Sequence, residues 1–82
     1  MRREQEIIVN RINELCMERN MTYYALASKS GVSLTTLMHI IDGTSGNPGV
    51  FTMKKLCKGL GISLKEFFHA EECKELLKVV EE

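Results

Sequence analysis

The stretch "ALASKSGVSLTTLMHIIDG", from Ala25 to Gly43, places two short helical patterns on either side of a very tight turn. The first pattern ends at Gly31, and Ser33 opens the second. Gly31 lacks a Cβ and so tolerates the backbone conformation that this turn requires. Ala27, four residues earlier, is small enough to let the two helices approach each other. Two helices joined by a three- or four-residue turn containing glycine form a helix-turn-helix, a rigid corner whose known use is to present its second helix to the major groove of DNA.

The rest of the chain also has the helical period, and no segment alternates with period two. The apolar spacing predicts helices over about residues 4–19, 23–30, 34–42 and 50–59, and a fifth after Ser63. Expected helix starts are Thr22, Ser33 and Ser63, and expected ends are Asn20, Gly31, Gly43 and Gly61. The predicted core stripes are Ile8, Ile12, Leu15 and Cys16, then Met53, Leu56, Cys57 and Leu60, then Leu64, Phe67 and Phe68. The sequence therefore predicts an all-α protein.

Length and composition fit one small globular domain. The chain has 82 residues, of which 44% are hydrophobic and 27% charged, so neither disorder nor a membrane span is expected. The beginning of the chain has no secretory signal, so we expect a cytoplasmic protein.

Three widely separated cysteines indicate buried thiols rather than disulfides. His69 and Cys73 could share a helix face as half of a metal site, but no second pair completes it, so no metal or other cofactor is expected.

The net charge of zero conceals an uneven distribution. Residues 51–68 carry four lysines against one glutamate, whereas residues 69–82 carry two lysines against five glutamates. The body of the chain up to residue 68 is therefore basic, and the tail cancels its charge.

The stretch from Met21 to Gly43 resembles the helix-turn-helix of the lambda-repressor and Cro-like family, also called the Xre family. The resemblance continues through "GISLKEFF", Gly61 to Phe68, and covers about residues 8–68. It implies a compact five-helix domain over residues 1–68, sequence-specific binding to double-stranded DNA, usually as a dimer, and regulation of transcription, with repression the expected mode. The matching positions are Thr22, Leu26, Ala27, Gly31, Val32, Ser33, Leu37, Ile40, Gly43, Pro48, Met53, Leu56, Cys57 and Leu60.

The residues that would meet DNA follow from this resemblance and from side-chain chemistry. Many family members carry Gln, Arg or Lys on the outer face of the third helix, whereas here that face has Leu34, Thr35, Met38 and His39. Hydroxyls can hydrogen-bond bases or phosphates, and Thr or Leu methyl groups can contact a thymine methyl. The expected base-edge contacts are Ser33, Leu34, Thr35 and His39. The expected phosphate contacts are Tyr23, Thr36, Thr44, Asn47, Lys54 and Lys55.

Each of these assignments has a structural alternative. The threonines could serve only as good residues for a helix start, and His39 could be a solvated histidine. Lys54 and Lys55 could form an ordinary solvated face of the fourth helix. An outer face without Arg or Lys also leaves open a protein-interaction module of the antitoxin or antirepressor kind. An enzyme is not expected, because no catalytic constellation or phosphate-binding loop is evident.

Residues 69–82 form an acidic amphipathic tail whose apolar residues are spaced as on one helix face. If the fifth helix continued unbroken, this stripe would point away from Leu64, Phe67 and Phe68. Either the chain breaks near residues 69–72 and folds back, with Ile7 or Val9 helping to receive it, or the tail pairs with a second copy. We expect a homodimer held by the stripe Cys73, Leu76, Leu77 and Val80.

Overall fold

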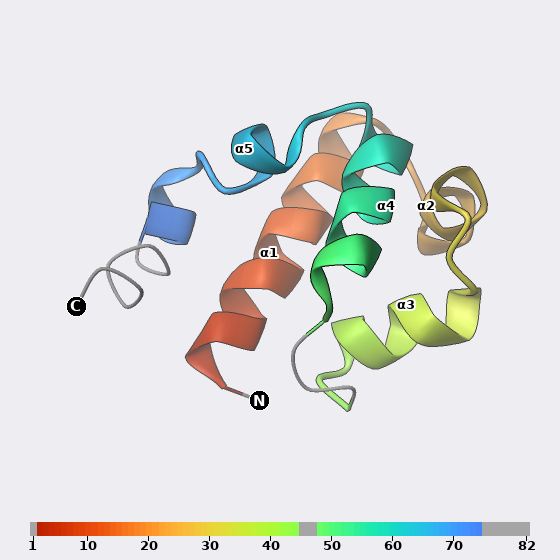
Figure 1. The fold of residues 1–82 in the computed structure, drawn as a ribbon, viewed down its shortest axis with the longest axis horizontal. Helices are drawn as coiled ribbons and strands as arrows, with labels where there is room; N and C mark the ends of the chain where they lie inside the picture. Colours follow the sequence, from red (N-terminus) through yellow and green to blue (C-terminus); the bar gives the residue numbers. More distant parts are fainter. Residues whose placement is uncertain (1, 45–47, 75–82) are drawn as a thin grey trace.

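A computed structural model describes residues 2–44 and 48–74, apart from the side chain of Glu72. Five α-helices follow one another, and a short 3₁₀ helix, η1, closes the described chain (Figure 1). Within these residues there is no strand, which agrees with the predicted all-α class. The helices are α1 (Arg3–Glu18), α2 (Tyr23–Ser30), α3 (Leu34–Ile41), α4 (Val50–Leu60) and α5 (Leu64–Phe67), and η1 is Glu71–Cys73.

The helix ends are where the local chemistry predicts them. Asn20, Gly31 and Gly61 have φ angles of 50°, 69° and 76°, the left-handed conformation that ends a helix. In each case the next N–H donates back to the carbonyl five residues before it, over 2.9 to 3.1 Å. These bonds join Met21 to Cys16, Val32 to Ala27 and Ile62 to Cys57.

Three of the helix starts are capped by the hydroxyl groups that the sequence indicates. Thr22, Ser33 and Ser63 each accept a hydrogen bond from the backbone N–H three residues further on, over 3.0 to 3.1 Å. This bond satisfies one of the N–H groups that a helix start leaves without a partner. The beginnings of α2, α3 and α5 are therefore set by one local interaction each.

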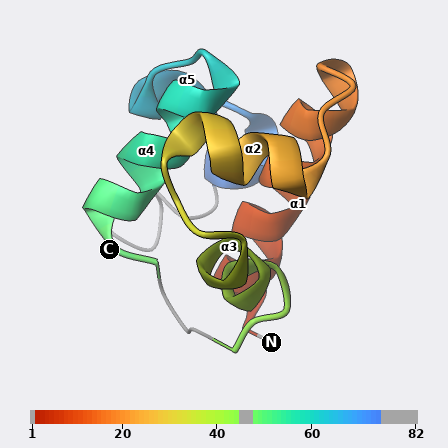
Figure 2. The same cartoon turned by 90° about the vertical axis from the view of Figure 1, so that its right-hand side faces the viewer.

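The core lies where α1, α2, α4 and α5 meet, and the inner side of α3 closes it (Figures 1 and 2). The predicted stripe of α4 is entirely buried, and Phe67 of α5 is fully buried, whereas Leu64 and Phe68 are half-buried beside it. The buried stripe of α1 differs from the prediction in two positions. Ile7 is fully buried although it was not part of the predicted stripe, and Ile8 is only partly buried. The largest fully buried side chains are Phe67, Ile7, Ile12, Leu26, Leu37, Leu56, Cys57 and Cys73.

The burial of Ile7 is explained by the path of the chain after α5. This helix ends at Phe67, the backbone is extended at Ala70, and η1 then packs against α1 (Figure 1). Cys73 is fully buried, so the structure places this side chain inside its own chain rather than on a surface open to a second copy. The fold-back alternative therefore describes the tail as far as Cys73. Leu76, Leu77 and Val80 lie outside the described residues, and the division of the chain at residue 68 stays a prediction.

The end of α2 and the last turn of α4 are in close contact at Ser30 and Gly59. A Cβ placed on Gly59 would lie 2.1 Å from Oγ of Ser30, 3.1 Å from its backbone nitrogen and 3.2 Å from its Cα. A larger residue would crowd this contact, since rotation of the serine hydroxyl would leave two tight backbone contacts in place. Oγ of Ser30 is buried and has no hydrogen-bond partner among the described residues.

Cations on α1 bind the carboxyl ends of two other helices. Arg11 donates from Nε to the carbonyl of Phe67 over 2.8 Å and from Nη2 to that of Glu66 over 3.0 Å. Arg19 donates from Nε to the carbonyl of Leu60, at the end of α4, over 2.8 Å. A helix end leaves carbonyls without partners and carries a partial negative charge, so these two arginines fasten α4 and α5 to α1.

Replacing Gly59 with alanine tests the contact between α2 and α4. Overpacking costs roughly 1–3 kcal/mol, which outweighs the roughly 1 kcal/mol by which alanine is the better helix former. We expect Gly59→Ala to lower the free energy of unfolding in a denaturant titration. Ser30→Ala removes a buried hydroxyl without a partner and should leave stability equal or higher. In the double variant the alanine at position 59 should cost less than it does alone. Strictly additive effects would show that the two side chains do not meet.

Replacing Arg11 with alanine tests the fastening of α5. Hydrogen bonds to charged groups contribute about 1.5–3 kcal/mol, and the Arg11 side chain is largely buried, so Arg11→Ala should lower the free energy of unfolding by about that amount. Lys55→Ala, which removes the same charge from the exposed face of α4, is the matched control and should change it by less than about 0.5 kcal/mol. Equal effects would mean that Arg11 acts only through net charge.

Candidate nucleic-acid interface

Helix α3 has one face in the core and one face in solvent. Leu37 and Ile40 are buried, and Ile41 is half-buried against the core. These anchors prevent the helix from rotating about its axis, because any rotation would expose them. Its other side is therefore presented in a fixed orientation.

The solvent face brings together four residues that the sequence places on it. Thr35 and His39 are exposed, and Leu34 and Met38 are 41% and 37% exposed. No residue of α3 is Lys, Arg, Asp or Glu. The surface that the turn at Gly31 presents is thus nearly uncharged, with two apolar side chains one helical turn apart.

The hydroxyl groups at the start of α3 differ in how they are used. Ser33 accepts from the Thr36 N–H over 3.1 Å, and its own hydroxyl donates to Oγ1 of Thr36 over 2.8 Å. Thr35 is exposed, and its side-chain hydroxyl has no hydrogen bond within the described residues. Ser33 and Thr36 therefore hold the helix start in shape, while Thr35 has its full hydrogen-bonding capacity available.

Tyr23, expected to contact phosphate, lies between α1 and α2. Its ring is half-buried against the core, and its hydroxyl donates to Oδ1 of Asn13. The oxygen can still accept a hydrogen bond. Its neighbour Tyr24 is exposed, and sequence reasoning missed it because it lies off every apolar stripe.

The loop after α3 is held by Asp42. Its Oδ1 accepts from the Thr44 N–H over 2.8 Å. Hydrogen bonds from Thr44 lower the pKa of this carboxyl group below its ordinary value, and the nearby His39 contributes in the same direction. Asp42 thus places a negative charge beside the solvent face of α3. Thr44 is exposed, and Asn47 lies outside the described residues.

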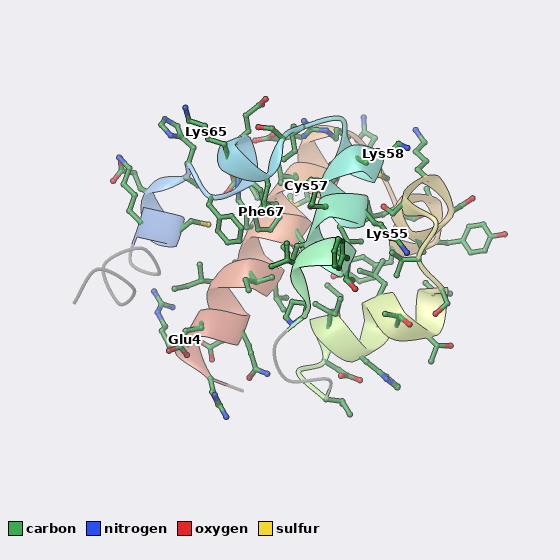
Figure 3. The ribbon with its side chains drawn as sticks, in the orientation of Figure 1. Glu4, Lys55, Cys57, Lys58, Lys65 and Phe67 are labelled. Atoms are coloured by element: carbon green, nitrogen blue, oxygen red, sulfur yellow. The ribbon has the colours of Figure 1, made fainter. Side chains whose placement is uncertain are left out.

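Positive charge beside α3 comes from α4. Lys54, Lys55 and Lys58 are all exposed, and α4 contains no acidic residue. Figure 3 shows Lys55 reaching toward the side of α4 on which α2 and α3 lie, whereas Lys65 lies on α5 at the opposite side of the molecule. The helix begins at Gly49 without a side-chain cap, so its first N–H groups are open to an anion.

A comparison with protein-family models matches residues 11–72 to the Cro/C1-type helix-turn-helix DNA-binding domain. The chain belongs to the Cro/C1-type helix-turn-helix family. Its members are DNA-binding regulators, and the match spans the second half of α1 and all of α2, α3, α4 and α5. The resemblance to the lambda-repressor and Cro-like domains is thereby confirmed.

A solved structure supports the same assignment. The chain is similar to a tyrosine-to-alanine mutant of the restriction-modification controller protein C.Esp1396I, with 29% sequence identity and a TM-score of 0.75. The similarity covers 92% of this chain and 95% of that one. A search of curated proteins finds no match. The family match and the similar structure together support DNA-binding regulation of transcription as the activity of this chain.

Other chemistry that the sequence raises is not assembled in this Cro/C1-type domain. His69 is exposed whereas Cys73 is fully buried, so the two do not share one open face. In the described part of the chain no three His, Cys, Asp or Glu side chains are grouped to hold a metal ion. Burial raises the pKa of the Cys16 and Cys57 thiols, which makes them poor nucleophiles. Among the described helices, none has both the length and the apolar character to cross a membrane.

Two further apolar residues near the start of α4 escaped the sequence analysis. Phe51 is 80% exposed and Val50 is 65% exposed. They follow the loop directly and lie off the buried stripe of α4. The helical period of α4 already places Phe51 nearly opposite this stripe, so the sequence did contain a signal for its exposure.

Proposed function

We propose that this protein is a sequence-specific transcriptional regulator that reads the major groove of double-stranded DNA with α3. The observation that carries the proposal is the fixed presentation of α3: Leu37 and Ile40 anchor it, and the turn at Gly31 sets its angle to α2. The N-terminal half of such a helix meets base edges in this class of domain. Ser33, Leu34, Thr35 and His39 are the proposed base-edge residues.

Contacts to phosphate supply the remainder of the proposed interface. Lys55 reaches toward the side of α4 on which α2 and α3 lie (Figure 3), Lys54 is exposed on the same helix, and the start of α4 has no side-chain cap. Cations and helix starts are common phosphate ligands. Tyr23, Thr36, Thr44 and Asn47 complete the proposed set. Because α3 itself contributes no cation, electrostatic attraction must come largely from α4.

Repression is the proposed mode of action. A protein that occupies duplex DNA blocks access to that DNA without needing a second activity. The restriction-modification controller protein with the similar structure supports a regulatory role for this chain. We propose that it acts in the cytoplasm, where its DNA partner would lie.

A protein-interaction module is the second candidate function. The uncharged outer face of α3 and the exposed Phe51 are what favour it. Both candidates use the same fold, and binding to duplex DNA distinguishes them.

Selection of bound duplexes from a random DNA pool tests the primary proposal. We expect an enriched, near-palindromic motif with half-sites about one helical turn apart. Leu34→Ala, Thr35→Ala and His39→Ala should alter the bases selected at individual positions. If no motif is enriched at moderate salt, the protein-interaction function takes the place of DNA reading.

The contribution of α4 is tested by two lysines of equal charge. We expect Lys55→Ala to weaken binding to all sequences evenly and to lower the slope of log affinity against log salt by about one unit. Lys65→Ala makes the same change of net charge on the far side of the molecule (Figure 3) and should leave this slope unchanged. Equal slopes for the two variants would place the DNA elsewhere.

Homodimer formation is proposed to involve Leu76, Leu77 and Val80. Truncation after Lys74 removes these three residues but keeps Cys73 in the core. The truncated chain should retain its melting temperature, sediment as a monomer and bind the selected duplex more weakly, because two copies double the contacts. A full-length chain that sediments as a monomer at high micromolar concentration would contradict a dimer held by the tail.

A further inference from the structure

The apolar pair on the solvent face of α3 is the most unusual feature of the proposed reading surface. Leu34 and Met38 are four residues apart and therefore lie on the same side of the helix, one turn apart. About three-fifths of each side chain is already covered by its own chain. The part of each side chain that stays in solvent can offer its methyl groups to a partner that lies along this face of α3.

The major groove contains one apolar group that matches such a surface. Each base pair presents hydrogen-bond donors and acceptors there, but only thymine adds a methyl group. A leucine or methionine placed against a guanine or cytosine edge would remove water from polar atoms and return no hydrogen bond, which is unfavourable. The same side chain against a thymine methyl removes apolar surface from water on both sides.

We propose that Leu34 and Met38 form a methyl-reading pair that selects thymine in the half-site. This inference rests on the proposed function and specifies its sequence preference. Thr35 lies beside Leu34 and has an uncommitted hydroxyl, so it supplies a hydrogen bond to the same region. Selection by the pair depends on methyl contact and not on charge, in keeping with the absence of Lys and Arg from α3.

Replacing thymine by deoxyuridine in the selected duplex tests the pair directly, because it removes the methyl group and preserves base pairing and every hydrogen-bonding atom. Burial of one such group contributes a factor of about four in affinity. We expect a loss of about fourfold at each contacted thymine for the natural protein. In Leu34→Ala or Met38→Ala the duplex with thymine and the duplex with deoxyuridine should bind equally at the position that the altered residue reads.

Lys55→Ala is the control on the protein side. It should weaken binding to both duplexes and leave the fourfold ratio between them unchanged. Leu34 and Met38 contribute partly exposed side chains and alanine favours helix, so the alanine variants should fold, which circular dichroism will verify.

The outcomes separate this inference from the function beneath it. A selected motif whose affinity is insensitive to deoxyuridine at every thymine would overturn the methyl-reading pair and leave DNA reading intact. The same holds if the fourfold loss persists in both alanine variants. Failure to select any motif would overturn both.

Discussion

The contact between Ser30 and Gly59 determines where the solvent face of this domain points. It lets the end of α2 lie close against α4, because Gly59 has no side chain to hold Ser30 away, and α2 in turn carries α3 through the short turn at Gly31. Once α2 is placed on α4, the left-handed Gly31 leaves α3 a single direction, and Leu37 and Ile40 fix its rotation. The orientation of the proposed reading surface thus depends on two glycines, Gly59 at the contact between α2 and α4 and Gly31 at the turn before α3.

The charges of this neutral chain are divided between holding the fold and meeting DNA. The guanidinium groups of Arg11 and Arg19 donate hydrogen bonds to carbonyls at the ends of α5 and α4, so neither belongs to the reading surface. The lysines of α4 are exposed, and Lys55 lies on the side of α4 that faces α2 and α3 (Figure 3). Formal net charge therefore says little about DNA binding here, because the cations that stabilise the domain count equally with those available to phosphate.

Much of the fold could be predicted from the sequence because its determinants are local. Thr22, Ser33 and Ser63 cap the helices that follow them, and Asn20, Gly31 and Gly61 end helices through their own backbone conformation. Burial that depends on distant segments was harder to predict. Ile7 was expected only as a residue that could receive a folded-back tail, and it is buried on α1, against which η1 packs from more than sixty residues away in the chain.

The same distinction applies to the candidate site. The apolar and polar faces of α3 follow from its period, so the placement of Leu34, Thr35, Met38 and His39 together could be predicted. The partners of Tyr23 and Arg11 could not, because both bonds join different helices. The roles of the site residues toward DNA remain predictions, since side-chain chemistry alone permits both contact and solvation.

The most direct test of the account is a map of amide chemical shifts in the isotope-labelled full chain, recorded with and without the selected duplex. If α3 enters the major groove, the largest changes will fall on residues 33–39 and on the first turn of α4, and α5 around Lys65 will change little. Largest changes on the α1 and α5 side, around Arg11 and His69, with α3 unaffected, would contradict the claim that the corner at Gly31 exists to present α3 to DNA.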